Sequence, residues 1–339
     1  MKKGKLFFIL TILSIFLGGV YLFYVHDKTE ALPSFISAHT TDKKYIIEKA
    51  GRIIDKADTL DEAIEKASQT KRSVAVNTYN GEWVYSDFNP FLIITKNAVH
   101  DFSDLKEAIL YAKKNDHTEV CYKNKNTIIW KAEDKREEEK EVLLDVPLIK
   151  QLPELPRGCE VTSLAMIMQY AGTDTGKMEL AEKIQKETIP YIKKGNRITC
   201  GNPNRGFVGN MYSMDSFGYG VYHEPIANLA KEYLGNRVVD LSELEFDDVL
   251  YILQQGYPVW IIANAEYRSL DDSYFEMWHT PTGIVKITYK LHAVVITGIK
   301  NDKIYINDPL SSIKNKMIDR DQLKAAWEQM GNQAIIILK

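Results

Sequence analysis

The sequence has little cysteine and no excess of charge of either sign. Its 339 residues include 3 cysteines, and 43 basic against 46 acidic residues give a formal net charge of −3. Scattered cysteines this few do not make a disulfide scaffold, and no CxxC pair or Cys/His cluster predicts zinc, so no metal or other cofactor is expected. A nearly balanced charge gives no reason to expect nucleic acid as a partner.

One long uncharged apolar run is present, and it lies at the amino end. Three lysines within residues 1–5 precede Leu6–Val25, a run of 20 residues without charge. Such a run is long enough to cross a bilayer as a helix, and the preceding lysines predict a cytoplasmic amino terminus. Residues 1–30 are therefore expected to be a membrane anchor, with the rest of a single-pass chain outside the cell. A cleaved signal sequence, cut after Ala31, is the alternative and would give a secreted protein.

A short repeat follows the anchor. Leu60-Asp-Glu-Ala-Ile-Glu-Lys-Ala67 recurs as Leu105-Lys-Glu-Ala-Ile-Leu-Tyr-Ala112, and each copy leads into a strand-like stretch and a tryptophan, Trp83 or Trp130. Two copies are too few for a solenoid, so residues 36–132 are predicted to form a small α/β module. The module has no chemical constellation of its own. A spacer or a binder of a cell-envelope partner is expected, with residues 133–141 as a charged linker.

The most informative stretch is Gln151-Leu-Pro-Glu-Leu-Pro-Arg-Gly-Cys-Glu160. A proline-rich loop ends at Gly158, and Cys159 then opens an apolar helix that Gly172 ends. A thiol in the first helical turn lies near unpaired N–H groups, which favour the thiolate and stabilise an oxyanion. A small buried hydrophobe is the plainer interpretation of Cys159 taken alone.

A second stretch supplies a histidine and a carboxylate. Two apolar runs, from Leu291 and up to Pro309, flank turn residues and predict a hairpin. If the turn is centred on Lys300, His292 lies opposite Asp308 on one face of the sheet. A carboxylate beside an imidazole orients it as a base, although a core histidine satisfied by Asp308 is the alternative.

The remaining chain supplies coarser predictions. His279 has no matching carboxylate on a neighbouring strand, and His223 is expected in a loop. Residues 177–187 and 245–255 are predicted to be helical and residues 258–263 a buried strand. The long glycine- and asparagine-rich stretch 195–220 is expected to border a substrate groove.

With these stretches in view, the chain resembles papain-like cysteine peptidases related to the bacteriocin-leader (double-glycine) processing domains, in their stand-alone, anchored or secreted branch. The resemblance rests on Gln151–Glu160, Gly201–Gly209, Gly218–Tyr222, His292–Gly298 and Tyr305–Pro309, in this order. The transporter-linked members have Asp-Cys-Gly where this chain has Gly158-Cys159-Glu160, which argues against leader processing.

The resemblance implies an α+β fold, with a papain-like domain over residues 142–339 that follows the repeated module and the anchor. It implies Cys159 as nucleophile, His292 as general base and acid, Asp308 as the orienting carboxylate and Gln151 as an oxyanion donor. The expected activity is hydrolysis of peptide bonds through a thioester, with a peptide or protein as substrate. Acyl transfer by the same residues, an inactive binding domain, and a repeat module that carries the function are the alternatives.

Overall fold

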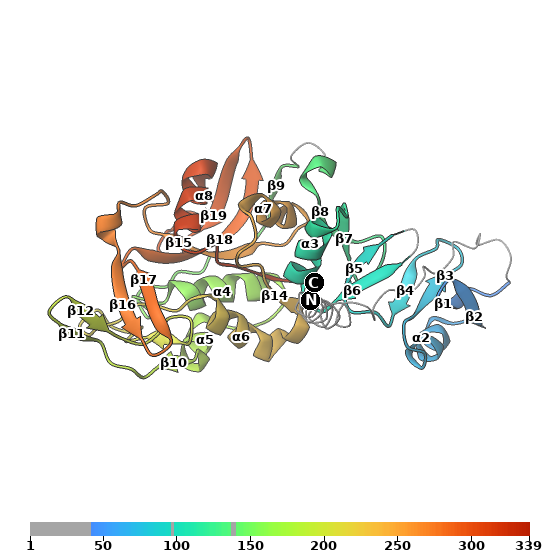
Figure 1. Cartoon of the computed structure of the whole chain (residues 1–339), viewed down its shortest axis with the longest axis horizontal. Coiled ribbons are helices and arrows are strands. Elements are labelled where there is room, and N and C mark those ends of the chain that lie inside the picture. Colours follow the sequence, from blue (N-terminus) through green and yellow to red (C-terminus); the bar gives the residue numbers. More distant parts are fainter. Residues whose placement is uncertain (1–41, 96–97, 137–139) are drawn as a thin grey trace, which may run out of the picture. The chain divides into compact units, whose positions relative to one another are not determined.

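The computed structural model describes residues 42–95, 98–136 and 140–339. It divides the chain into two compact units, Met1–Ala132 and Glu133–Lys339, each described by itself below (Figure 1). The predicted anchor at Leu6–Val25 lies outside the described residues. Within the described ranges, no helix combines the length and the apolar character that a membrane span requires.

The first unit is built from two copies of one motif, two strands, a helix and two further strands. The sheets have equivalent antiparallel orders, β2-β1-β3-β4 and β6-β5-β7-β8. The elements are β1 (Tyr45–Lys49), β2 (Arg52–Ala57), α2 (Leu60–Ser68), β3 (Ser73–Asn77) and β4 (Trp83–Ser86), then β5 (Phe91–Ile94), β6 (Val99–Phe102), α3 (Leu105–Lys114), β7 (Glu119–Tyr122) and β8 (Ile128–Lys131). Each of the two sequence copies thus lies in an equivalent motif, which also includes a hairpin before the helix.

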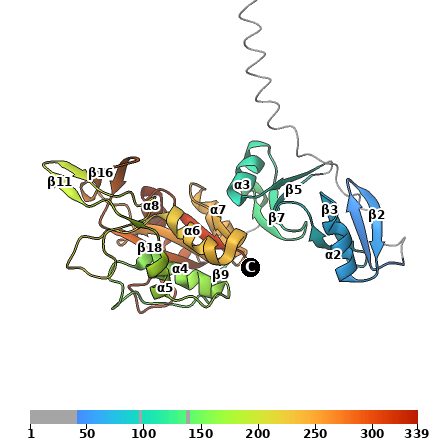
Figure 2. The same ribbon diagram turned by 90° about the horizontal axis from the view of Figure 1, so that it is seen from below.

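The repeated helix pattern has a structural reason. The side chains of Thr59 and Asp104 cap the two helices by accepting the N–H of the residue three positions on, at 3.3 and 2.9 Å. Buried alanines spaced four apart, Ala63 and Ala67 in α2, form one small face. That face allows α2 to pack closely on its sheet (Figure 2).

The two copies share a hydrophobic core. Residues of both sheets belong to a single buried cluster: Ile46, Val74, Val76 and Trp83 of the first copy, with Leu92, Val99 and Cys121 of the second. Trp130 is also buried. Both tryptophans therefore act as core residues, as the sequence predicts, and the two sheets stabilise one another by burying apolar surface.

The second unit is organised around a seven-stranded sheet. Its order is β14-β21-β15-β18-β19-β20, and β9 pairs with β18. The strands are β9 (Val142–Leu143), β14 (Val238–Asp240), β15 (Val259–Asn264), β18 (Leu291–Lys300), β19 (Lys303–Asn307), β20 (Lys316–Asp319) and β21 (Ala334–Ile337). The helices are α4 (Cys159–Tyr170), α5 (Lys177–Lys183), α6 (His223–Leu234), α7 (Phe246–Gln254) and α8 (Arg320–Gln329). The predicted strand at 258–263 and helix at 245–255 correspond to β15 and α7.

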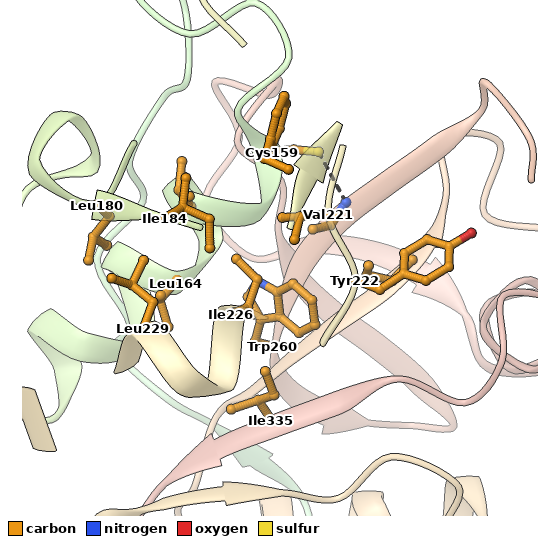
Figure 3. Close-up of a cluster of buried hydrophobic side chains, with 14 of the residues drawn as sticks. Cys159, Leu164, Leu180, Ile184, Val221, Tyr222, Ile226, Leu229, Trp260 and Ile335 are labelled. Carbon is orange, nitrogen blue, oxygen red and sulfur yellow. Dashed lines mark hydrogen bonds between the residues drawn. The ribbon is translucent and has the colours of Figure 1, made fainter. Parts of the chain in front are cut away.

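Helices cover both faces of this sheet. Alternate residues of β15 and β18, among them Trp260 and Val295, join the cluster that contains α4, α5 and α6. The strand residues between them face α7 and α8, which contact β18 and β15 (Figure 1). Because both faces are covered, β15 and β18 are buried along nearly their whole length rather than at alternate residues. Helix α4 is thereby fixed against the centre of the sheet (Figure 3).

Three features differ from the sequence predictions. The helix predicted over 177–187 ends at Lys183, because the chain then pairs β10 (Lys186–Glu187) with β13 (Phe207–Val208). Within the predicted linker 133–141, Arg136 donates to Asp248 of α7 at 2.6 Å and so attaches this segment to the second unit. A four-stranded sheet that no sequence pattern indicated consists of β11 (Ile192–Lys194), β12 (Arg197–Thr199), β16 (Glu276–Thr280) and β17 (Gly283–Ile287).

Candidate active site

The amino end of α4 places Cys159 against the main sheet. The helix begins at Cys159, as predicted, after the cap residue Gly158. A Cβ atom on Gly158 would lie 2.6 Å from Cβ of Leu155, so a larger residue has no room where the loop folds back on itself. Only 6% of Cys159 is exposed. Its backbone N–H lies in the first turn, where such groups have no intrahelical acceptor and are suited to bind an oxyanion.

Two hydrogen bonds hold the thiol. The Ala293 backbone N–H donates to Cys159 Sγ at 3.4 Å, the dashed line in Figure 3, and the S–H donates to Glu160 Oε2 at 3.3 Å. Burial, followed by the negative charge of Glu160, raises the pKa of the thiol well above its ordinary value despite the Ala293 hydrogen bond. The resting site therefore holds a protonated thiol. The helix end favours the thiolate, but burial has the larger effect on the pKa of the thiol and favours the neutral form.

His292 lies in β18 beside a carboxylate. Its Nε2 is 2.8 Å from Asp308 Oδ1, and both residues are buried. The pairing that the sequence predicted is thus present. Because Nε2 faces the carboxylate, Nδ1 is the ring nitrogen that remains for proton transfer.

The register of the hairpin that brings the pair together differs from the predicted one. The turn is formed by Asn301 and Asp302, whose φ angles are +50° and +56°, and not by a turn centred on Lys300. Asparagine and aspartate tolerate this left-handed conformation better than most residues. The pairing also shifts by one residue beside Gly298. Strand β19 therefore ends before Asp308, which reaches His292 from the following loop rather than as a cross-strand neighbour.

Further donors hold Asp308. The Tyr267 hydroxyl donates to Oδ2 at 2.8 Å, the Leu310 N–H to Oδ1 at 2.9 Å, and Lys316 Nζ lies 3.3 Å from Oδ2. Burial alone would raise the pKa of Asp308, but the hydrogen bonds from His292 and Tyr267 and the charge of His292 hold it well below its usual range. The carboxylate stays ionised, as required to orient an imidazole.

Sequence reasoning missed Tyr267. This residue follows β15 with a φ of +52°, an unusual conformation for an aromatic residue. Its ring centre lies 6.3 Å from that of His292, and the ammonium of Lys316 lies 4.6 Å over its face. Neither Tyr267 nor Lys316 belongs to a motif. Only the return of three separate segments to one place reveals them, and a single sequence carries no signal for that.

Gln151 lines the same pocket but its amide is already used. Its Nε2 donates to the backbone carbonyls of Leu155 and Pro156, at 3.2 and 3.0 Å, and its own N–H donates to Pro309 O at 3.0 Å. Its buried Oε1 has no hydrogen-bond partner in the described structure. In this conformation Gln151 braces the loop before Cys159. Donation to an oxyanion requires its amide to leave those carbonyls.

A pocket of about 360 Å³ joins these residues. Cys159, His292 and Gln151 line it together with Phe217, Tyr219 and Tyr289. The predicted groove-bordering stretch 195–220 does border it, through residues 214 and 217–219. Trp278 lies behind the pocket wall, with its ring centre 4.9 Å from that of Tyr219. Cys159 and His292 thus line one cavity that has an aromatic wall.

The other candidate groups lie elsewhere in the fold. His223 is the first residue of α6 rather than a loop residue, and its Nδ1 lies 2.6 Å from Asp240 Oδ2. His279 lies in β16 and is not among the residues that line the pocket. Cys121 and Cys200 are free and buried. Across residues 42–95, 98–136 and 140–339, no three acidic, histidine or cysteine side chains gather as metal ligands.

Comparison with known proteins identifies the family of this unit. The model of the Peptidase_C39 like family matches residues 143–335. Uncharacterized protein YvpB of Bacillus subtilis (strain 168) is 43% identical over 198 residues, which cover 58% of this chain and 76% of YvpB.

Two solved structures are also similar. A candidate C39-like peptidase from Bacillus anthracis has 46% sequence identity and a TM-score of 0.56, over 59% of this chain and 98% of its own. The peptidase domain of Streptococcus ComA, a bi-functional ABC transporter of a quorum-sensing pathway, is more distant, at 16% identity and a TM-score of 0.34 over 57% of this chain and 98% of that domain. The family match and the identity to YvpB show that the chain belongs to the Peptidase_C39-like family and carries its α+β fold.

Proposed function

We propose that the second unit is a cysteine peptidase that hydrolyses peptide bonds, with Cys159 as nucleophile, His292 as general base and acid, and Asp308 as the orienting carboxylate. The observation that carries the proposal is the buried His292–Asp308 hydrogen bond of 2.8 Å in the pocket that Cys159 also lines. Cys159, His292 and Asp308 come from separate parts of the chain, and a shared pocket that joins a thiol to a carboxylate-oriented imidazole supports catalysis better than three separate packing roles.

The mechanism follows from these positions. The Cys159 proton passes to His292 Nδ1, and the sulfur attacks the substrate carbonyl carbon. The backbone N–H of Cys159 stabilises the oxyanion, with Gln151 as a second donor if its amide turns toward the pocket. His292 then protonates the leaving amine and later activates the water that hydrolyses the thioester. Asp308 keeps the imidazole oriented and its charge compensated throughout.

The test is cleavage of a peptide library by the full-length protein, with products identified by mass spectrometry. Cys159→Ala is expected to lower the rate by at least about 1000-fold, because the nucleophile is lost. Cys200→Ala is the matched control: it removes another buried thiol, one outside the pocket, and is expected to keep activity. Cleavage retained by Cys159→Ala would refute the nucleophile assignment. Added amines distinguish hydrolysis from acyl transfer, because transfer gives amine-linked products.

One observation favours a second function. The thiol is buried and its S–H is held by Glu160, as in a domain that binds a peptide in the pocket without cleaving it. In that case the library peptides bind, but neither the wild type nor any variant releases products. Isothermal titration with Cys159→Ala, which removes turnover, measures such binding directly.

We further propose that the peptidase unit lies outside the cytoplasm, anchored through Leu6–Val25. The support is the 20-residue uncharged run behind basic residues. Protease treatment of intact cells is expected to degrade the unit, whereas protection from protease contradicts this location. The size of the mature chain separates an anchor from a signal sequence cleaved after Ala31. A cell-envelope partner for the repeat module is tested by pull-down from envelope fractions.

A further inference from the structure

Glu160, the residue after the nucleophile, is an unusual buried acid. Its side chain is fully buried, and within the described residues no lysine or arginine forms an ion pair with it. Burial raises its pKa to about 7, against opposing backbone hydrogen bonds. An acid without a cation in such a place is costly to ionise, so its position next to the nucleophile requires a reason.

Both carboxyl oxygens of Glu160 have fixed partners. Oε1 accepts the Val221 N–H at 3.0 Å, and Oε2 lies 3.3 Å from Cys159 Sγ. The backbone carbonyl of Glu160 accepts the indole N–H of Trp260 at 3.0 Å. The hydrogen bonds to Val221 and Trp260 thus hold Glu160 in place, with its second carboxyl oxygen against the Cys159 sulfur.

A glycine makes the space for this carboxyl group. A Cβ atom on Gly220 would lie 2.2 Å from Glu160 Oε1. Any side chain at this position would push the carboxyl group out of place. The backbone of residues 220 and 221 therefore both admits the carboxyl group and binds it.

Few other groups titrate beside it. Tyr219 faces Glu160 from the segment before α6, and burial raises the pKa of this phenol well above its ordinary value, so it stays neutral. From β18, His292 lines the pocket of the nucleophile, and from β15 the neighbour is the uncharged Trp260. On α4 itself the neighbour is Cys159. The thiol and the carboxyl are therefore the acids in direct contact here.

Two acids at 3.3 Å in a buried site do not ionise independently. Two negative charges at this distance repel strongly where water is excluded, so the doubly ionised state is suppressed. While Glu160 is ionised, its carboxylate accepts the S–H and keeps the thiol neutral. When Glu160 is protonated, its O–H points at the sulfur and stabilises a thiolate instead.

We infer that Glu160 is a catalytic residue that controls the nucleophile: Cys159 reacts as a thiolate only in the state in which Glu160 carries a proton and donates it in a hydrogen bond to the sulfur. The inference rests on the proposed role of Cys159. In the step itself, the S–H bond breaks with its electron pair left on sulfur, and the proton goes to His292 Nδ1. Glu160 keeps its own proton throughout, so charge and atoms balance as a thiolate–imidazolium pair beside a neutral carboxylic acid.

The test is the rate of Cys159 alkylation by iodoacetamide in the full-length protein, with Cys121→Ala and Cys200→Ala in the background. In the wild type the rate is expected to fall about tenfold between about pH 6 and about pH 8, as Glu160 ionises around its pKa of about 7. Glu160→Gln keeps an acceptor for Val221 and a permanent donor toward the sulfur. It is expected to alkylate at a rate that stays within about twofold over the same range.

Glu182→Gln, an exposed acid on α5, is expected to retain the wild-type profile. A wild-type rate that rises steadily, as for a free thiol of pKa about 8.5, overturns the inference, and so does a Glu160→Gln profile identical to that of the wild type. If Glu160→Gln does not fold, the infrared S–H stretching band of the wild type is measured instead. The intensity of this band is expected to rise as pH rises through 7. An intensity that stays constant or falls contradicts the inference. Alkylation needs no substrate. A protein that cleaves no peptide can therefore still show the expected pH profile of alkylation, so the peptidase proposal and the Glu160 inference fail separately.

Discussion

At the scale of single residues, the site depends on how Asp308 is held. The Tyr267 hydroxyl donates to one oxygen of the carboxylate that orients His292. Tyr267 is a positioning residue, and its left-handed backbone indicates that the surrounding structure enforces its place.

Tyr267→Phe removes the hydroxyl and keeps the ring. We expect kcat to fall about 10- to 100-fold, since hydrogen bonds to charged groups contribute about 1.5–3 kcal/mol. KM is expected to stay unchanged, because the hydroxyl does not line the pocket. A steady-state comparison with Tyr274→Phe, a half-exposed tyrosine outside the pocket, checks this. Equal loss in both variants would indicate a general effect on folding.

Glu160 also links stability to pH. Its pKa is raised from 4.5 to about 7 in the folded state, so between these values the folded protein binds more protons than the unfolded chain. Stability is therefore lost as pH rises through this window. Glu160→Gln is expected to remove that slope, with a gain on the order of 3 kcal/mol at about pH 8 relative to its effect at about pH 4. Urea unfolding at both pH values measures it; parallel curves for wild type and variant contradict it.

At the scale of elements, the central hairpin shows what the sequence could and could not predict. The apolar runs correctly predicted two strands and the approach of His292 to Asp308. The register was wrong, because the two-residue turn at Asn301–Asp302 moves the pairing away from the predicted one and the shift beside Gly298 restores only one residue of that difference. The alternating pattern of a strand indicates which residues share a face of the sheet, but it does not reveal such irregularities in the pairing.

The same limit explains the other differences. Helix α4 was predictable because Pro156, Gly158 and Gly172 mark its ends. The four-stranded sheet of β11, β12, β16 and β17 was not, because its strands are short and β12 pairs with β16 across the 76 residues that separate Thr199 from Glu276. Glu160 was visible in the sequence, but its burial against Cys159 and Gly220 belongs to tertiary structure.

Gly298 tests the packing of the hairpin. A Cβ atom there would lie 2.4 Å from Val142 O, where β9 pairs with β18. Gly298→Ala is expected to destabilise the protein by about 1–3 kcal/mol, the usual cost of overpacking. Gly176→Ala is the control, because nothing lies within 4 Å of its added Cβ and its φ of −93° suits any residue. Thermal unfolding compares them; equal melting temperatures would show that β9 yields without cost.

At the scale of the whole molecule, every residue assigned to the site lies in the second unit. Its main cluster is drawn from residues 146–337. We expect residues 133–339, expressed alone, to fold cooperatively and to show the Cys159 alkylation rate of the full chain within about threefold. Near-UV circular dichroism and alkylation of the fragment check this. A fragment that aggregates or reacts as an ordinary thiol would show that the first unit is required.

The common core of the first unit constrains how this protein can change by recombination. Since side chains from both copies of the motif fill one cluster, a break at residues 87–90 would leave each half with a bare apolar face that only the other half fits. Two such molecules can satisfy those faces by exchanging halves, so a strained or lengthened connection at this point favours domain-swapped dimers. Neither copy is therefore expected to fold as a portable module.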